Sequence, residues 1–120
     1  MPFLGPQSPG EIRSSSATLA QPFTDTTLAG GASTPFPDLY ISNTFQQSLL
    51  IRQSAIGAGL VTVTVWMAYG IEFIPVESFV IGALNVSERR TYRQAARSMR
   101  VVFTAPGAGC VVIGSFGGMG

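Results

Sequence analysis

The arginines are the most concentrated group of side chains capable of specific chemistry. Five of the seven basic residues lie between residues 89 and 100. They are Arg89, Arg90, Arg93, Arg97 and Arg100. A guanidinium donates paired hydrogen bonds to phosphate or carboxylate groups. Only one aromatic residue, Tyr92, lies among them, which does not favour stacking on single-stranded nucleic acid. We expect these arginines to contact a protein partner. A phosphate-binding surface and a merely solvated one are the alternatives.

Other residue types limit the possible reactions. The chain has neither histidine nor lysine, which excludes Ser–His and Cys–His catalysis, Schiff-base chemistry and zinc sites that need histidine. Cys110 is the only cysteine and lies in an apolar run, so we expect a small core residue. Glu72 and Glu77 are a weak candidate for paired-carboxylate hydrolysis. The sequence therefore predicts a protein that is not an enzyme and has no cofactor, catalytic or metal site.

The overall composition points to a covered surface. Charged residues make up 11% of the chain, about half the usual share. Such a surface is expected to be covered by copies of the chain, by another protein or by lipid. The net charge of +1 selects no partner. The N-terminus has neither a basic start nor a long apolar run, so we expect no signal peptide.

The sequence divides near residue 38. Residues 1–38 hold six of the eight prolines and are rich in serine, threonine and glycine, a composition that does not fold alone. We expect an extended arm over 1–38 that is ordered by a neighbouring subunit, followed by one folded domain over 39–120. The large apolar side chains of the arm are its expected partner-binding anchors: Phe3, Leu4, Phe23, Leu28 and Phe36.

The second part has the pattern of strands. From Leu60 to Tyr69, valines alternate with threonines, which is the two-residue period of a strand with one wetter face. Val63 and Val65 are expected to face the core. Further short runs at similar spacing predict about seven strands and a β-sandwich, for which a jelly roll is one topology. These runs are 39–42, 47–53, 71–74, 79–84, 99–104 and 110–116.

Two segments allow other interpretations. Residues 87–99 fit a short helix that begins at Ser87, with the arginines along one side, but a long polar hairpin uses the same residues. The stretch from Gln53 to Ile71, centred on Ile56–Tyr69, is uncharged and nearly long enough to span a bilayer. Its glycines, threonines and strict alternation favour a strand instead. A small nucleic-acid-associated protein and a small membrane protein therefore remain the alternative functions.

Taken together, the arm from Met1 to Pro37, the entry at Asp38-Leu-Tyr40 and the weakly charged β region resemble small bacteriophage virion proteins. The resemblance is one of class, covers the whole chain and rests on no specific motif, so no functional residue is carried over. It implies a capsid decoration or cement protein: a homo-oligomer, often a trimer, whose arm binds neighbouring coat subunits. Head–tail and tail proteins are similar in style. The location implied is the virion, assembled in the host cytoplasm.

Overall fold

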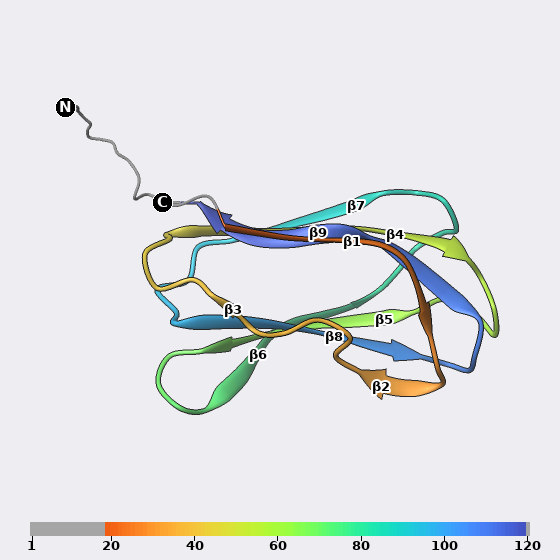
Figure 1. Cartoon of the computed structure of the whole chain (residues 1–120), viewed down its shortest axis with the longest axis horizontal. Helices are drawn as coiled ribbons and strands as arrows, with labels where there is room; N and C mark the ends of the chain where they lie inside the picture. The colour runs from red at the N-terminus through yellow and green to blue at the C-terminus, as the bar shows by residue number, and fades with distance from the viewer. Residues whose placement is uncertain (1–18, 120) are drawn as a thin grey trace.

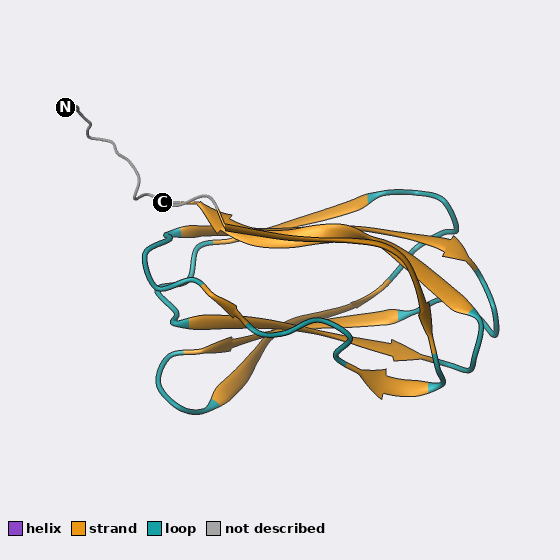
Figure 2. Ribbon diagram, viewed as in Figure 1, coloured by secondary structure: helices purple, strands orange, loops and turns teal. Residues whose placement is uncertain are grey.

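The computed structural model of the chain describes residues 19–119, with side chains from residue 26 onward. All regular elements in this range are strands (Figure 2). In chain order they are β1 (Leu19–Leu28), β2 (Gly31–Ser33), β3 (Leu39–Tyr40), β4 (Gln46–Ala55), β5 (Thr62–Ala68), β6 (Phe73–Val80), β7 (Glu88–Tyr92), β8 (Ser98–Ala105) and β9 (Cys110–Met119).

The strands form two stacked antiparallel sheets (Figure 1). One has the order β1-β9-β4-β7, and the other has the order β2-β8-β5-β6, with β3 also pairing β8. Among the described strands, only β5 and β6 are consecutive and hydrogen-bonded to each other, while the other connections from β3 onward cross between sheets. This order is that of a jelly roll in which β2 and β3 share one strand position. The predicted β-sandwich is confirmed.

The core lies between the sheets and follows the predicted alternation. Val63 and Val65 of β5 are fully buried, whereas Thr62 and Thr64 are partly exposed. Phe103 of β8 and residues of β4 and β9 complete the same layer. The uncharged stretch centred on Ile56–Tyr69 contains β5, which lies between β8 and β6 in the second sheet. In the described part of the chain, no helix is long and apolar enough to cross a membrane.

The expected helix over 87–99 is wrong, and so is the hairpin alternative. Glu88–Tyr92 forms β7, which pairs β4 in the first sheet. Ser98–Ala105 forms β8, which pairs β5 in the second sheet. The segment therefore crosses from one sheet to the other. Backbone pairing with two strands distant in sequence overrode a local pattern that was compatible with a helix.

The expected boundary at residue 38 is also displaced. β1 pairs β9 from Leu19↔Gly118 to Leu28↔Cys110, and β2 pairs β8 from Gly31 to Ser33. Residues 19–38 therefore belong to the sandwich. The two edge strands in this range were not predicted because their sequence is polar and contains proline. Edge strands need fewer apolar residues than central strands. The expected arm can include only residues 1–18, which lie outside the described range.

Candidate functional site

The sandwich separates the five arginines. Arg89 and Arg90 lie on β7, Arg93 and Arg97 lie in the connection that crosses between the sheets, and Arg100 lies on β8. Because the expected helix is absent, they do not form a single stripe. Arg89 and Arg93 are exposed, and no ion pair joins either of them to another residue within 19–119. Each of the other three arginines contacts a different set of residues within the chain.

Arg100 binds Asp38 across the outer face of the second sheet. Its Nε and one terminal nitrogen donate to the two oxygens of the Asp38 carboxylate, at 2.8 and 2.9 Å. These hydrogen bonds raise the pKa of Arg100. The guanidinium carbon also lies 3.8 Å from the ring centroid of Phe73 on β6. A paired and stacked arginine of this kind holds a fixed position.

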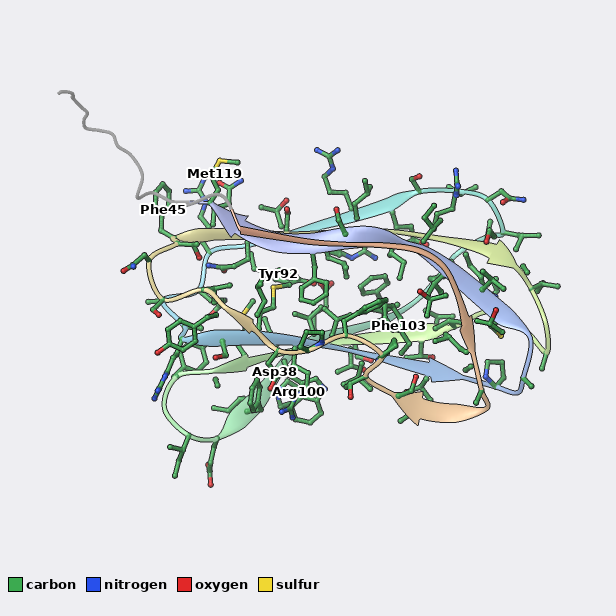
Figure 3. The ribbon with its side chains drawn as sticks, viewed as in Figure 1. Asp38, Phe45, Tyr92, Arg100, Phe103 and Met119 are labelled. Carbon is green, nitrogen blue, oxygen red and sulfur yellow. The ribbon has the colours of Figure 1, made fainter. Side chains whose placement is uncertain are left out.

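These residues line an open groove of about 710 Å³ on the outer face of the second sheet. One wall is the connection between β2 and β3, Thr34–Asp38, and the floor is formed by β5, β6 and β8. Figure 3 shows Asp38 and Arg100 together on the side of β8 that faces away from Phe103 and Tyr92. The floor side chains are Trp66, Phe73, Arg100 and Val102.

Trp66 is the feature of this groove that sequence reasoning missed. It lies beside Arg100 in the register of β5 and β8, and beside Pro75 in the register of β5 and β6. Its indole Nε1 is buried and has no hydrogen-bond partner among the described residues. The alternation of Leu60–Tyr69 already indicated that this large aromatic side chain lies on the wetter face of the strand, with the threonines. Which strands would lie beside it was not visible in the sequence.

Arg90 joins the two sheets at the β6–β7 edge. Its Nε lies 3.4 Å from an oxygen of Glu77 on β6, and its guanidinium carbon lies 4.0 Å from the ring centroid of Phe79. Tyr92 donates a 2.7 Å hydrogen bond to the other oxygen of Glu77. Burial, followed by this hydrogen bond, raises the pKa of Tyr92. Glu77 is thus engaged in this structural cluster, which argues against the weak catalytic pairing with Glu72.

Arg97 lies at one end of the sandwich near exposed aromatic residues. Its Nε donates to the Tyr40 hydroxyl at 3.2 Å, and this hydrogen bond lowers the pKa of Tyr40. Tyr69 donates a hydrogen bond to the Gln94 side chain in the same connection. The β5–β6 turn follows Tyr69 and carries Ile71, which is 94% exposed.

The residues expected to anchor the arm to a partner lie in different environments. Leu28 is 2% exposed and belongs to the chain's own core. Phe36 packs edge-to-face on Phe103, with ring centroids 6.2 Å apart, so it anchors the Thr34–Asp38 connection to the same core. Leu28 is therefore wrong as a partner contact, whereas Phe36 is only partly buried and lines the groove, so its contact with a partner stays a prediction. Phe3 and Leu4 lie outside the described residues, and Phe23 lies in β1 with its side chain outside the described set.

Exposed apolar residues gather in small groups at the ends of the sandwich. Tyr69, Ile71 and Ile74 line one shallow depression at the β5–β6 turn. Phe45 and Met119, which are 63% and 53% exposed, are joined by a backbone hydrogen bond from Phe45 N to Met119 O. Figure 3 shows both side chains beside the end of β9. Groups of this kind are typical of protein–protein contacts.

The described side chains include several features suited to binding. No group of three histidine, cysteine or carboxylate side chains within the described range is placed to hold a metal ion. Cys110 is buried, and its Sγ lies 3.3 Å from the carbonyl oxygen of Ile56. What the surface does offer is an aromatic groove with a fixed cation and several exposed apolar groups.

No protein-family model and no curated protein sequence matches the chain. Among solved structures, it is similar to a protein of Bacillus endospore appendages, which are described as a novel family of disulfide-linked pili. The two are 23% identical, the TM-score is 0.54, and the similarity covers 88% of this chain and 89% of the other. A likeness at this identity shows that the two proteins share the fold.

Proposed function

We propose that this chain is a non-enzymatic structural subunit that assembles with copies of itself. The observation that carries the proposal is the surface: large apolar side chains such as Ile71 and Phe45 are 94% and 63% exposed. Charged residues are only 11% of the sequence. A monomer would leave these apolar groups in water, whereas contact with another subunit would bury them at a gain of roughly 25 cal/mol per Å².

The shared fold supports the same class of function. The similar protein comes from an appendage described as a pilus, which is an assembly of repeated subunits outside the cell. Repeated contacts between unlike patches of one subunit build an open filament, while self-complementary contacts close into a ring or small oligomer. Both outcomes fit exposed groups at several places on one small sandwich.

A finer form of the proposal follows from the sequence resemblance to virion proteins. In that form the chain binds neighbouring coat subunits as a bacteriophage decoration or cement protein. Residues 1–18 would reach the neighbour, with Phe3 and Leu4 as apolar anchors and Arg89 and Arg93 available for acidic groups. Leu28, which is buried in the chain's own core, plays no part in it.

Sedimentation and electron microscopy of the purified full chain test the proposal. We expect regular fibres, rings or larger particles to form as the concentration rises. Ile71→Asp should raise the concentration needed for assembly by at least about tenfold, without a change in melting temperature, because this side chain makes few contacts in the monomer. Asn43→Asp is the matched control, since it adds the same charge at an exposed polar position.

These measurements distinguish a self-assembling subunit from a decoration protein. A chain that assembles alone supports the self-assembling subunit. A chain that stays small alone but sediments with phage capsids supports the decoration form. A chain that remains monomeric at all concentrations and binds no capsid contradicts the proposed function.

A further inference from the structure

The groove on the outer face of the second sheet carries hydrogen-bond donors on an aromatic floor. Trp66 contributes an indole N–H that has no partner among the described residues. Arg100 contributes a guanidinium fixed by Asp38 and by the ring of Phe73. The Trp66 indole N–H is buried beneath the surface, whereas the terminal nitrogen of Arg100 that does not bind Asp38 remains a donor for a ligand. A ligand rich in acceptors and rings would therefore complement this surface.

Proline-rich peptides have this chemistry. Proline has no N–H, so such a segment presents carbonyl acceptors and flat apolar rings, and it loses little entropy on binding because its backbone is already restricted. Segments with the spacing Pro-x-x-Pro bind aromatic-lined grooves in this way. The chain itself contains that spacing at Pro6-Gln-Ser-Pro9, within residues 1–18, with a further proline at Pro2.

We propose that the Pro6–Pro9 segment of a second copy binds in the groove formed by Trp66, Phe73, Arg100 and Val102. The proline rings pack on the aromatic floor, and a peptide carbonyl accepts from the terminal nitrogen of Arg100 that does not bind Asp38. This inference rests on the proposed self-assembly and names one contact that would serve it. Tryptophan and arginine are also the residues that most often dominate the binding energy of protein interfaces.

The reach of the chain is sufficient for such a contact. Leu19 pairs Gly118 in the first sheet, and Figure 1 shows this sheet stacked on the second sheet. The groove lies on the outer face of that second sheet. The ten residues from Pro9 to Leu19 span up to about 33 Å when extended. That is about three times the spacing of two stacked sheets, about 10 Å, and it allows the segment to leave its own sandwich for a neighbour.

The single tryptophan of the chain makes the contact directly measurable, because Trp66 is the only source of tryptophan fluorescence. The recipient is the full chain carrying Pro6→Ala and Pro9→Ala, so that its own segment does not compete. The probe is a synthetic peptide of residues 1–12, which contains no tryptophan. We expect a saturable change of Trp66 emission, and at least about tenfold weaker binding of the same peptide with both prolines replaced by alanine.

Two matched substitutions in the recipient locate the binding. Val102→Glu places a charge in the groove and should abolish the response to the peptide. Val80→Glu makes the same change at a 58% exposed position of β6 that does not line the groove, and should leave the response unaltered. Circular dichroism checks that both variants are folded. Equal binding of the two peptides, or an unaffected response in Val102→Glu, overturns the proposal.

The wild-type chain tests whether the segment comes from a second copy. We expect its Trp66 emission to depend on protein concentration and that of the Pro6→Ala/Pro9→Ala chain not to. An emission difference between the two chains at every concentration would mean that the segment binds its own groove, which overturns the second-copy contact. Assembly that persists in the double-alanine chain, with no peptide response, rejects this inference and leaves the proposed function standing.

Discussion

At the scale of residues, individual side chains join the two sheets at an edge where no backbone pairing does so. Tyr92 and Arg90 of β7 both contact the carboxylate of Glu77 on β6. The tyrosine is 8% exposed, so its hydroxyl has lost most of its water and depends on this acceptor. The charge of Tyr92 is disfavoured by burial and by the adjacent carboxylate, and its pKa is raised accordingly.

The raised pKa of Tyr92 predicts a loss of stability in alkali. In the unfolded chain the group ionises near its ordinary pKa of 10.0, whereas in the folded chain it stays neutral to higher pH. Its contribution is complete below pH 10.0 and is lost as the pH rises toward the folded-state pKa. Urea unfolding between pH 8 and pH 11 should show wild type losing up to about 1.4 kcal/mol per pH unit more than Tyr92→Phe above that point.

The Tyr92→Phe variant also lacks the hydrogen bond to Glu77, so at pH 8 it should be about 1 kcal/mol less stable than wild type. The gap between the two proteins should then narrow as the pH rises. Parallel curves across the whole range would mean that Tyr92 is not buried against Glu77 in the folded chain.

At the scale of elements, glycine allows the last strand to pass close to a loop. β9 lies between β1 and β4, and Gly118 near its end is buried against Thr44. Thr44 itself donates to the carbonyl of Ile41 at 2.8 Å and accepts from Gln47 at 2.9 Å. A side chain at residue 118 would have to displace this buried polar group.

Gly118→Ala should therefore destabilise the sandwich. The added Cβ would lie 2.7 Å from Thr44 Oγ1 and 2.9 Å from its Cβ, and overpacking of this kind costs about 1–3 kcal/mol. Gly70→Ala is the control, because its Cβ would meet nothing within 4 Å, and its effect should stay within about 0.5 kcal/mol. Thermal unfolding of both variants measures the difference. Equal losses would show that β9 does not approach Thr44 closely.

At the scale of the whole molecule, the single cysteine of this sequence is too few for a filament linked by disulfides from subunit to subunit. Each subunit within a disulfide-linked filament needs at least two cysteines, one for each neighbour. This chain has Cys110 alone, and that residue is fully buried. The similar pilus protein belongs to a family described as disulfide-linked, so an assembly of this chain would differ from it in being held by non-covalent contacts.

The expected result is an assembly that is insensitive to reduction. Its sedimentation should be the same with and without a reducing agent, and denaturing gels run without reductant should show monomers. Each apolar contact can be weakened singly, as with Ile71→Asp, because no covalent bond supports it. A covalent dimer that disappears on reduction would contradict this view and would show that Cys110 becomes exposed.

The sequence by itself determined the central strand and limited the reactions that its side chains could carry out. The valines of Thr62–Ala68 alternate because one face of a buried strand must be apolar, and this local pattern predicts both the strand and its inward side. The absence of histidine and lysine, together with the single cysteine, restricted the chemistry without any structure.

Only the tertiary structure decided the edges and the surface. β1 and β7 are strands because β9 and β4 offer them backbone hydrogen bonds, a cause that lies far away in the sequence and leaves little local pattern. The same long-range pairing separated five arginines that are neighbours in the sequence. It also brought Asp38, Trp66, Phe73 and Arg100 together from three strands and a connecting segment. A groove made in this way depends on strand order, which local composition does not encode.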